Sequence, residues 1–441
     1  MPSHWFAQHD LPADIWLRDA RVPAALLAAP PANAPPDPDG LVRLDLRLTD
    51  GLVAAIAPTG TAPDGTASAG IDMDGGQLWP CLVDAHVHLD KTEIWQRATN
   101  PDGTHPGAVG AVTADRLAHW SEADIAARFA FGLACAYAHG TAAMRTHIDS
   151  YGAHAANGWS AFARLRDAWS GRIALQASSL CPTNRLDGDD GVALADLVAE
   201  HGGLFGMSTT STPVDDDFRA RLRRFFDLAA ARGLRVDLHV DESGEQAARS
   251  LKEVAIEAIR RDWGQTIQCG HCCALAVQTD EEAAETIALV RDAGIAIVVL
   301  PMCNMYLQGR APGRTPRWRG VTLIQEFAAA GVPVSFASDN CRDPFYPYVD
   351  YDMLEVFRES VRIAQLDHPI GPWPASAAAT PAQVCGLPGG RIAVGQPADL
   401  IAFRARGMSE LLARPQADRV VLRRGRVIDA VVPDYRDLDR L

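Results

Sequence analysis

Short apolar runs alternate with longer amphipathic stretches through the middle of the chain. Strand-type apolar segments lie near residues 80–86, 141–148, 172–180, 203–208, 234–240, 266–270, 295–300 and 333–338. Stretches with a helical period follow them, such as EADIAARFAFGLACAYAHG, which ends at Gly140, and DFRARLRRFFDLAAARG, which ends at Gly233. Eight strand–helix repeats predict a parallel sheet, and eight strands are the number that closes a barrel. We therefore predict an α/β fold of the TIM-type (β/α)8 barrel class.

Both ends of the chain carry a β pattern that the middle lacks. Residues 15–22 (IWLRDARV) and the run VRLDLRLTDGLVAAIAP, with a turn at Asp50-Gly51, predict strands near the start. The runs ADLIAFRA and DRVVLRRGRVIDA, with a turn at Arg424-Gly425, predict strands near the end. We expect a small β domain built from residues 1–75 and 386–441, and a catalytic barrel over residues 76–385.

Composition and charge narrow the classes of protein that fit. The chain has 441 residues, of which 48% are hydrophobic and 22% charged, an ordinary globular composition. The formal net charge of -14 argues against nucleic acid as a partner, because phosphate binding needs clustered Lys and Arg. No run of about 18 apolar residues predicts a membrane span, and the start MPSHWFAQHD lacks the basic region of a signal peptide. We expect a cytoplasmic homo-oligomer that binds neither nucleic acid nor membrane.

The nine cysteines do not form a disulfide framework in a chain of this length. Cys269 and Cys272 make one C-x-x-C within CGHCC, but no second pair follows that could complete a structural zinc site. We predict buried thiols in a reducing compartment.

The stretch CLVDAHVHLDKT, residues 81–92, ends an apolar strand-type run with His86 and His88. Side chains two apart point to the same side of a strand, so both imidazoles can face one point. Neutral imidazole is a preferred ligand for zinc and suits iron. Taken alone, the pair is equally compatible with chance or with two hydrogen-bonded surface residues, and a metal site needs further ligands.

Further polar side chains follow the other predicted strands. They are His147 in MRTHID, His239, Asp241 and Glu242 in LHVDESGEQ, His271 in CGHCC, and Asp339 in FASDN. The catalytic groups of a (β/α)8 barrel lie at the carboxyl ends of its strands. We therefore expect these residues to meet in one site.

This order of motifs resembles the amidohydrolase superfamily over nearly the whole chain. The resemblance comprises an H-x-H after strand one, a His after strands five and six, an Asp after strand eight, and the run GQPADLIAF (395–403) of the flanking β domain. The chain is also similar to the bacterial cytosine deaminase family, including its 5-methylcytosine deaminases, in HVHLDKT, MRTHID, DLHVDESGEQ, NMYLQGR and SDNCRDPFYP. Several independent motifs in one order make a chance match implausible.

The resemblance implies a metal site and a set of catalytic roles. The implied ligands of one divalent ion, Zn²⁺ or Fe²⁺, are His86, His88, His239 and Asp339. Such an ion brings the pKa of its water near neutrality and makes hydroxide available. Dinuclear members carry a lysine at the end of strand four, and the matching run GLFGMSTTS has none, so we expect a single ion. Glu242 is implied to carry a proton to the substrate's ring nitrogen, His271 to hold and polarise the hydroxide, and Asp339 to accept its proton.

Two departures from the cytosine deaminase pattern concern the substrate. Asn340 stands where these enzymes have a second aspartate, and SLCPTN (179–184) lacks their glutamine, so that Thr183 or Asn184 would have to substitute for it. Phe345 matches an aromatic residue beside the base, and Gln308 of NMYLQGR is a further candidate for substrate contact.

Three residues keep more than one interpretation. For His147, packing in the core or a hydrogen bond to a site residue fits as well as direct contact with substrate. Lys91 is expected to form a salt bridge at the barrel rim with Asp90 or Glu93. His105, in the loop after strand one, could line the pocket or lie at the surface.

These observations predict a metal-dependent hydrolytic deaminase with a small nitrogen heterocycle as its substrate. It would release ammonia from a free pyrimidine base of the cytosine or 5-methylcytosine type, or from a similar cyclic amidine. The alternatives are release of an alkylamine from a triazine and opening of a cyclic amide such as a hydantoin. A non-catalytic metabolite-binding barrel is a third hypothesis, and Glu242 argues against it because binding alone needs no proton carrier.

Overall fold

The computed structural model describes residues 11–61, 69–210 and 212–439, which separate into two compact units. The β unit comprises Met1–Asp84, Ala134–Ala143 and Asp352–Pro433. The barrel unit comprises Ala85–Leu133, Met144–Tyr351 and Asp434–Leu441. The domain boundaries expected at residues 75/76 and 385/386 stay a prediction.

Parallel strands form the ring on which the site is built, as the sequence predicts. Two parallel sheets, in the orders β6-β7-β8 and β12-β11-β10-β9, supply seven of its segments. Their bounds are β6 (Leu82–Val87), β7 (Thr141–Asp149), β8 (Ala174–Leu180), β9 (Asp237–Val240), β10 (Ile267–His271), β11 (Ile295–Val299) and β12 (Val334–Phe336). A parallel bridge from Val87 to Asp339 joins the first sheet to the second, and the Asp339 N–H donates to the carbonyl of His86 over 2.9 Å.

The fourth segment of the ring, residues 204–208, makes bridges instead of a continuous strand. It pairs with β8 through Ser178–Leu204 and with β9 through Ser208–His239, both parallel. Gly206 explains the irregular backbone, because a Cβ there would lie 2.3 Å from the Ser179 carbonyl oxygen and 2.4 Å from that of Asp237. The segment thus packs closely between β8 and β9. With it as the fourth member, the predicted eight-membered (β/α)8 arrangement is confirmed.

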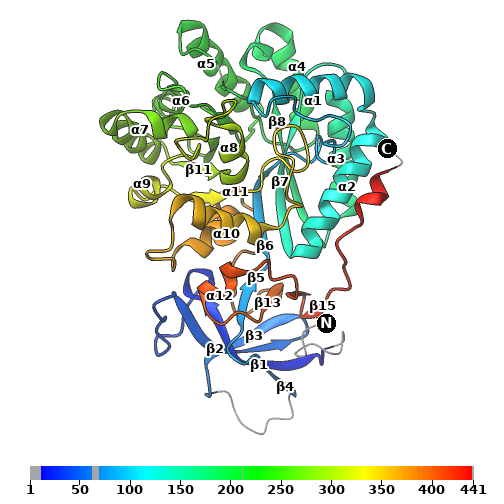
Figure 1. The fold of residues 1–441 in the computed structure, drawn as a ribbon, viewed down its shortest axis with the longest axis vertical. Helices are drawn as coiled ribbons and strands as arrows, with labels where there is room; N and C mark the ends of the chain where they lie inside the picture. The colour runs from blue at the N-terminus through cyan, green and yellow to red at the C-terminus, as the bar shows by residue number, and fades with distance from the viewer. Residues whose placement is uncertain (1–10, 62–68, 211, 440–441) are drawn as a thin grey trace. The chain divides into compact units, whose positions relative to one another are not determined.

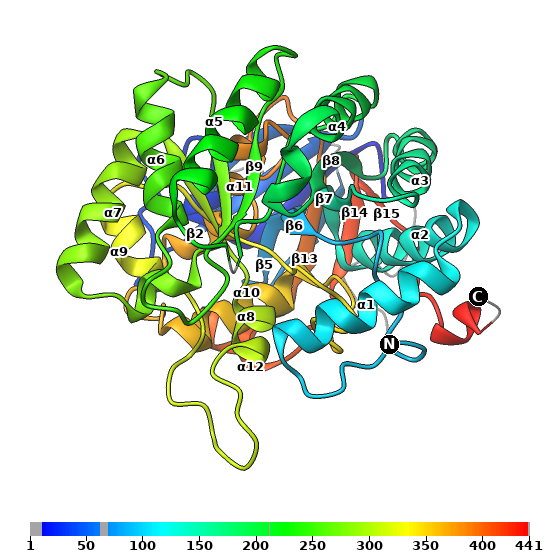
Figure 2. The same cartoon turned by 90° about the horizontal axis from the view of Figure 1, so that it is seen from above.

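Helices follow the strands and cover the outside of the ring, where Figure 2 shows α3 to α7 around the strands. Those of the barrel connections are α1 (His105–His119), α2 (Glu122–His139), α3 (Ala155–Ala168), α4 (Gly188–Glu200), α5 (Asp216–Ala230), α6 (Ser250–Arg260), α7 (Asp280–Asp292), α8 (Pro301–Leu307) and α9 (Ile324–Ala329). The helix α5 begins at a cap in which Asp215 accepts from the Phe218 N–H, and it buries Phe218, Leu222 and Phe225 at helical spacing. Phe225 stacks on Phe205 of the fourth segment with ring centroids 4.9 Å apart.

The β unit contains one mixed sheet in the order β15-β14-β13-β5-β1-β2-β3, with β4 paired to β1 (Figure 1). Its strands are β1 (Asp14–Pro23), β2 (Leu41–Thr49), β3 (Leu52–Pro58), β4 (Ala69–Asp72), β5 (Gln77–Pro80), β13 (Leu400–Phe403), β14 (Val420–Arg423) and β15 (Arg426–Val427), and its helices are α10 (Met353–Ala364), α11 (Ala379–Cys385) and α12 (Met408–Ala413). The predicted turns at Asp50-Gly51 and Arg424-Gly425 are confirmed, with φ of 51° and 80° in the first and 48° and 69° in the second. Leu17, Leu44 and Leu400 belong to the buried core of the sheet.

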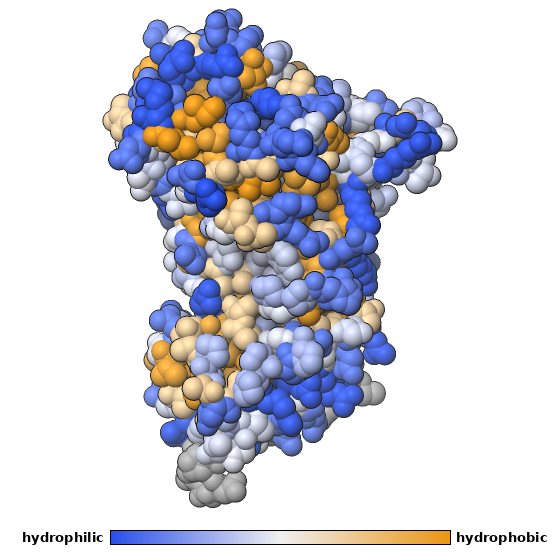
Figure 3. Space-filling view, turned by 90° about the vertical axis from the view of Figure 1, so that its left-hand side faces the viewer, coloured by the Kyte–Doolittle hydropathy of each residue, from blue (hydrophilic) through white to orange (hydrophobic). Residues whose placement is uncertain are grey.

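The cysteines and the surface show the following features. All nine cysteines are buried and free, as predicted. Hydrophilic side chains occupy most of the face seen in Figure 3, with smaller hydrophobic areas between them. Among the helices of the described ranges, none combines the length and apolar character that crossing a bilayer would need.

Candidate active site

Three imidazoles and one carboxylate converge where β6, β9 and β12 end. The Nε2 atom of His239 lies 3.1 Å from Nε2 of His86 and 3.2 Å from Nε2 of His88. The Oδ1 atom of Asp339 lies 3.5 Å from Nε2 of His86 and 3.2 Å from Nε2 of His88. Ligand atoms bound tetrahedrally at zinc–ligand distances are about 3.3–3.6 Å apart. The nitrogens of His86, His88 and His239 therefore fit one divalent ion with Asp339 beside two of them, and His147 and His271 are further candidate ligands next to His86.

Burial keeps the three histidines neutral, the form that binds metal. Desolvation lowers the pKa of His86, His88 and His239 far below the ordinary histidine value, and the neighbouring imidazoles lower it further. Each ring can therefore offer a lone pair to a cation at neutral pH.

Asp339 is a buried carboxylate that lacks an ordinary donor. Apart from the weak thiol donor of Cys303, neither of its side-chain oxygens accepts a hydrogen bond from the described part of the chain. Burial and the nearby Glu242 raise its pKa, whereas a bound cation would favour its charged form. Buried carboxylates are paired or bind metals, so this unsatisfied group is the observation that best supports a cation site.

Several residues near the site have a positive backbone φ. His271 and Asp339 have φ of 70° and 65°, in the left-handed region that non-glycine residues seldom adopt. Asp241, with φ of 48°, does not join the cluster as expected, because its carboxylate accepts from the N–H groups of Ser250 and Leu251 at 3.1 Å and 2.9 Å. Such residues cluster at functional sites, where the surrounding structure offsets their strain. Each lies at the carboxyl end of a barrel strand or immediately after it.

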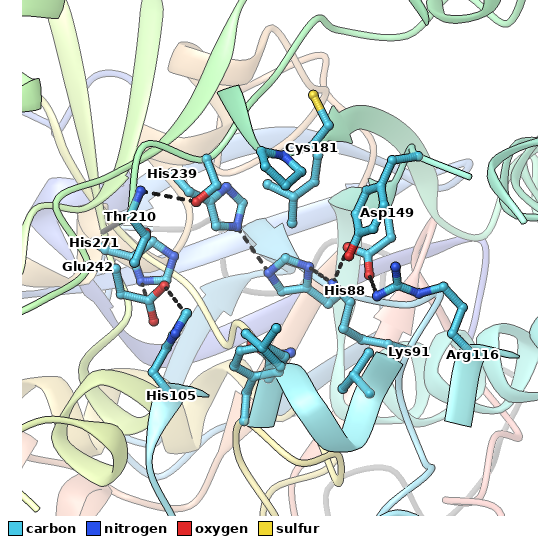
Figure 4. A pocket seen from close by; sticks show the side chains of 18 of the residues that line it. His88, Lys91, His105, Arg116, Asp149, Cys181, Thr210, His239, Glu242 and His271 are labelled. Carbon is cyan, nitrogen blue, oxygen red and sulfur yellow. Dashed lines mark hydrogen bonds and ion pairs between the residues drawn. The ribbon is translucent and has the colours of Figure 1, made fainter. Parts of the chain in front are cut away.

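Glu242 lies beside this cluster with partners on both of its carboxylate oxygens. Its Oε1 is 3.4 Å from Nδ1 of His271 and accepts from Nδ2 of Asn304 at 3.4 Å, while its Oε2 is 3.6 Å from Nε2 of His105 (Figure 4). Burial alone would raise the pKa of Glu242, but His271 and His105 outweigh it, and the pKa lies below the ordinary value. Burial lowers the pKa of His271 to about 4, so His271 is neutral.

A cavity of about 230 Å³ opens onto the cluster. Its polar lining includes His88, His239, Glu242, His271 and Asn340. Its apolar lining includes Val109, Val112, Leu180, Pro182 and Phe345. This combination suits a flat, mostly apolar ring with a few polar atoms at one end.

The predicted substrate residues divide into those that reach this cavity and those that do not. Asn340 and Phe345 line it. Gln308 contacts the site indirectly, because its Nε2 donates to the backbone carbonyl of Glu242 at 3.3 Å. Thr183 and Asn184 are not among the lining residues, because a 3-10 turn begins at Thr183 and leaves Pro182 at the cavity.

His147 lies within the barrel interior instead of at the cavity. Its ring centroid is 3.9 Å from that of His86, and its Nε2 is 3.3 Å from Oδ1 of Asp237. Arg145 donates to the other oxygen of Asp237 at 2.8 Å, so a buried polar layer supports the histidines. The structure thus favours packing beneath the site over substrate contact for His147.

The salt bridge expected for Lys91 at the barrel rim is wrong, because Lys91 is buried and its partner is neither Asp90 nor Glu93. Lys91 is buried, and its Nζ donates to Oδ1 of Asp149 at 2.7 Å, while Oδ2 of Asp149 accepts from Arg116 at 2.9 Å. Glu93 pairs instead with Arg342, its Oε2 lying 2.8 Å from Nε. Lys91, Asp149 and Arg116 all line the cavity, and Figure 4 shows them as a chain of contacts beside His88.

Two contacts of the site were not predicted from the sequence. Asn304 donates through Nδ2 to Nδ1 of His271 at 3.0 Å, and it is the first residue of the NMYLQGR motif on which the resemblance rests. His105 lines the cavity and contacts Glu242, whereas the sequence left its place open.

Comparisons with known proteins agree with this architecture. The sequence profile of the Amidohydrolase family matches residues 134–429. A pterin deaminase of Rhizobium rhizogenes (strain K84 / ATCC BAA-868) is 50% identical over 425 residues, which cover 96% of this chain and 95% of the relative.

Two solved structures share the fold. The 5-methylcytosine deaminase of Klebsiella pneumoniae with 5-fluorocytosine bound has a TM-score of 0.79 at 24% identity, over 94% of this chain and 97% of that one. The N-isopropylammelide isopropylaminohydrolase of Burkholderia multivorans ATCC 17616 has a TM-score of 0.72 at 22% identity, over 94% of this chain and 98% of that one.

Proposed function

The chain belongs to the amidohydrolase family, and we propose that it is a metal-dependent deaminase that hydrolyses the 2-amino group of a pterin. Water replaces the amino group at a ring carbon, so that one C–N bond breaks, a carbonyl forms and ammonia leaves. The observation that carries the substrate assignment is the 50% identity to a pterin deaminase over 96% of this chain.

The pterin proposal refines the pyrimidine expectation without changing the chemistry. A pterin contains a 2-amino-4-oxopyrimidine ring fused to a second ring, so its reacting carbon belongs to a cyclic amidine of the kind that the motifs predict. The apolar lining by Val109, Leu180 and Phe345 gives the second ring a matching surface. A pyrimidine base of the cytosine or 5-methylcytosine type is the second candidate, which the resemblance to cytosine deaminases supports.

His86, His88, His239 and Asp339 would hold the ion in this proposal. When bound, a divalent cation supplies a water of lowered pKa that can act as a nucleophile at neutral pH. Neutral imidazoles and a buried carboxylate suit either Zn²⁺ or Fe²⁺, and the proposal does not depend on which is present.

Three residues of this protein would transfer protons or orient the attacking water. Glu242, whose carboxylate is ionised before the reaction, would take a proton from the attacking water and deliver it to the ring nitrogen next to the reacting carbon, and its place in the cavity lining puts it within reach of both. His271, neutral and beside Glu242, would orient the attacking water through its ring. Asp339 would accept the remaining proton of that water on the carboxylate oxygen that does not hold the ion, and pass it to the leaving amine.

A substrate panel tests the assignment. Metal-loaded protein should release ammonia from pterin faster than from cytosine, 5-methylcytosine or isocytosine, and absorbance should report the dioxo product. Faster turnover of a pyrimidine would transfer the assignment to the second candidate. An alkylamine from an aminotriazine, or a ring-opened acid from a hydantoin, would overturn deamination. The expected cytoplasmic location and homo-oligomer stay predictions.

A further inference from the structure

The helix α1 places one of its faces along the cavity. His105, Val109, Val112 and Arg116 share this face at helical spacing, and all four line the cavity. His105 is the first residue of the helix, so its side chain lies at the end of this face that is next to Glu242.

The loop before α1 holds His105 in place through its own hydrogen bonds. Asn100 donates through Nδ2 to the carbonyls of Thr104 and of Pro344, at 2.9 Å and 3.0 Å, which ties this loop to the one that carries Phe345. Thr104 caps the helix by accepting from the Gly107 N–H at 3.1 Å. A Cβ at Gly107 would lie 2.2 Å from Oδ1 of Asp102, so a larger residue would displace the Asp102 carboxylate, which accepts from the Thr104 N–H.

His105 lies on the Oε2 side of Glu242, where it forms the one ion pair or hydrogen bond found for that oxygen among the described residues. Its Nε2 is 3.6 Å from Oε2, whereas Asn304 and His271 both lie against Oε1. The side chain of His105 is 25% exposed and that of Glu242 only 7%, so His105 lies on the solvent side of the carboxylate. The other neighbour of His105 is Phe345, with ring centroids 5.5 Å apart in an edge-to-face arrangement.

We propose that His105 is a positioning residue that fixes the carboxylate of Glu242 by holding its Oε2, and thereby sets the direction in which Glu242 delivers its proton. This inference rests on the proposed deaminase function. With Asn304 3.4 Å from Oε1 and His105 3.6 Å from Oε2, rotation of the carboxylate about its last bond would lengthen at least one of these two contacts. Preorganisation of this kind avoids the cost of orienting the proton carrier during each turnover.

An apolar residue could fill the same space against Phe345 but could not reach Glu242 with an N–H. The variants His105→Leu and His105→Gln therefore separate packing from positioning, because glutamine keeps a donor of similar reach. We expect kcat to fall about tenfold or more in His105→Leu with KM within about threefold, and His105→Gln to recover most of kcat. A rise in KM alone would instead make His105 a substrate-binding residue and overturn the proposal.

A double-mutant cycle tests whether the effect passes through Glu242. In the Glu242→Gln background, His105→Leu should lower kcat by less than about threefold, because the group that it positions is already disabled. The same loss in both backgrounds would show that His105 acts independently, which contradicts the proposal.

A measurement that does not depend on catalytic activity tests this inference separately from the proposed function. Burial lowers the pKa of His105, but its interaction with the Glu242 carboxylate, whose Oε2 lies 3.6 Å from Nε2, outweighs burial, so the pKa lies above the ordinary histidine value. His105 also interacts electrostatically with His271, which remains in place in the variant. In Zn²⁺-loaded protein labelled at the histidine rings, NMR titration should therefore show a lower His105 pKa in Glu242→Gln than in the parent. An unchanged pKa would overturn the contact itself, whereas failure of the parent to deaminate any heterocycle would overturn only the proposed function.

Discussion

The Nε2 atoms of His86 and His239 lie 3.1 Å apart although the two residues end different strands of the barrel. A hydrogen bond between these atoms requires one ring to carry its proton on Nε2, whereas a cation bound to both lone pairs stabilises the same approach with both protons on Nδ1. Because metal affinity and folding are coupled in such sites, removing one ligand should affect both.

The variant His239→Ala should lose metal and activity together. It removes the nitrogen that lies nearest to both other histidines, so the remaining three groups provide an incomplete ligand set. Elemental analysis of the purified protein should show metal content well below one ion per chain. Full occupancy in this variant would exclude His239 as a ligand.

The variant Glu242→Gln should keep its metal and lose turnover. Glutamine preserves the size and most hydrogen bonds of the side chain but removes the proton carrier, and general acid–base groups contribute about 10²–10⁴-fold. We expect kcat to fall within this range while metal content equals that of the parent. Activity within about threefold of the parent would assign proton transfer to His271 and Asp339 instead.

Replacing Arg145 by methionine should destabilise the barrel unit. Its Nη1 lies 2.8 Å from Oδ2 of Asp237, and both side chains are buried, so removal of the cation leaves an uncompensated charge. Such changes cost about 3–5 kcal/mol of unfolding free energy, which chemical denaturation can measure. The double variant Arg145→Met with Asp237→Leu should recover much of this loss, because no unpaired charge remains. A single variant as stable as the parent would contradict this account.

Stability of the β unit should depend on pH through Asp352. Burial raises the pKa of this carboxyl, but Arg419, whose Nη1 donates to Oδ1 at 2.7 Å, outweighs burial and holds the pKa below its ordinary value. A carboxyl with a depressed folded-state pKa stabilises the protein above its unfolded-state pKa of about 3.9, and this stability is lost as pH falls through the folded-state pKa. At neutral pH we expect Asp352→Asn to cost about 3 kcal/mol.

Denaturation of the parent and Asp352→Asn at several pH values checks this sign. The difference between the two proteins should be largest near neutrality and should shrink as acid protonates Asp352. A difference that grows on acidification would mean that another group controls the pH dependence.

Regular periodicity explains which parts of the site the sequence could predict. His86, His88, His239, His271 and Asp339 follow apolar runs at strand ends, and all strands of a parallel barrel end on one side, so their convergence follows from local pattern and fold class. The repeat count likewise predicts the eight-membered ring, including the segment at 204–208 that forms only bridges.

Contacts made through loops lie outside such patterns. Lys91 turns inward to Asp149 instead of toward Asp90 or Glu93, and this depends on how the chain bends after β6. Asn304 reaches His271 because a short helix starts directly after β11, and His105 reaches Glu242 because Asn100 anchors its loop. Local residue patterns do not encode these three-dimensional paths, which tertiary packing decides.

The hydrogen bond from the Asp339 N–H to the His86 carbonyl joins the first strand of the ring to the last, and both residues belong to the proposed metal site. During synthesis, His86 and His88 leave the ribosome well before Asp339. The full ligand set can therefore form only after Asp339 has also been synthesised. Metal uptake thus reports on ring closure, and a chain truncated before residue 339 would bind the ion weakly even if every earlier strand had folded.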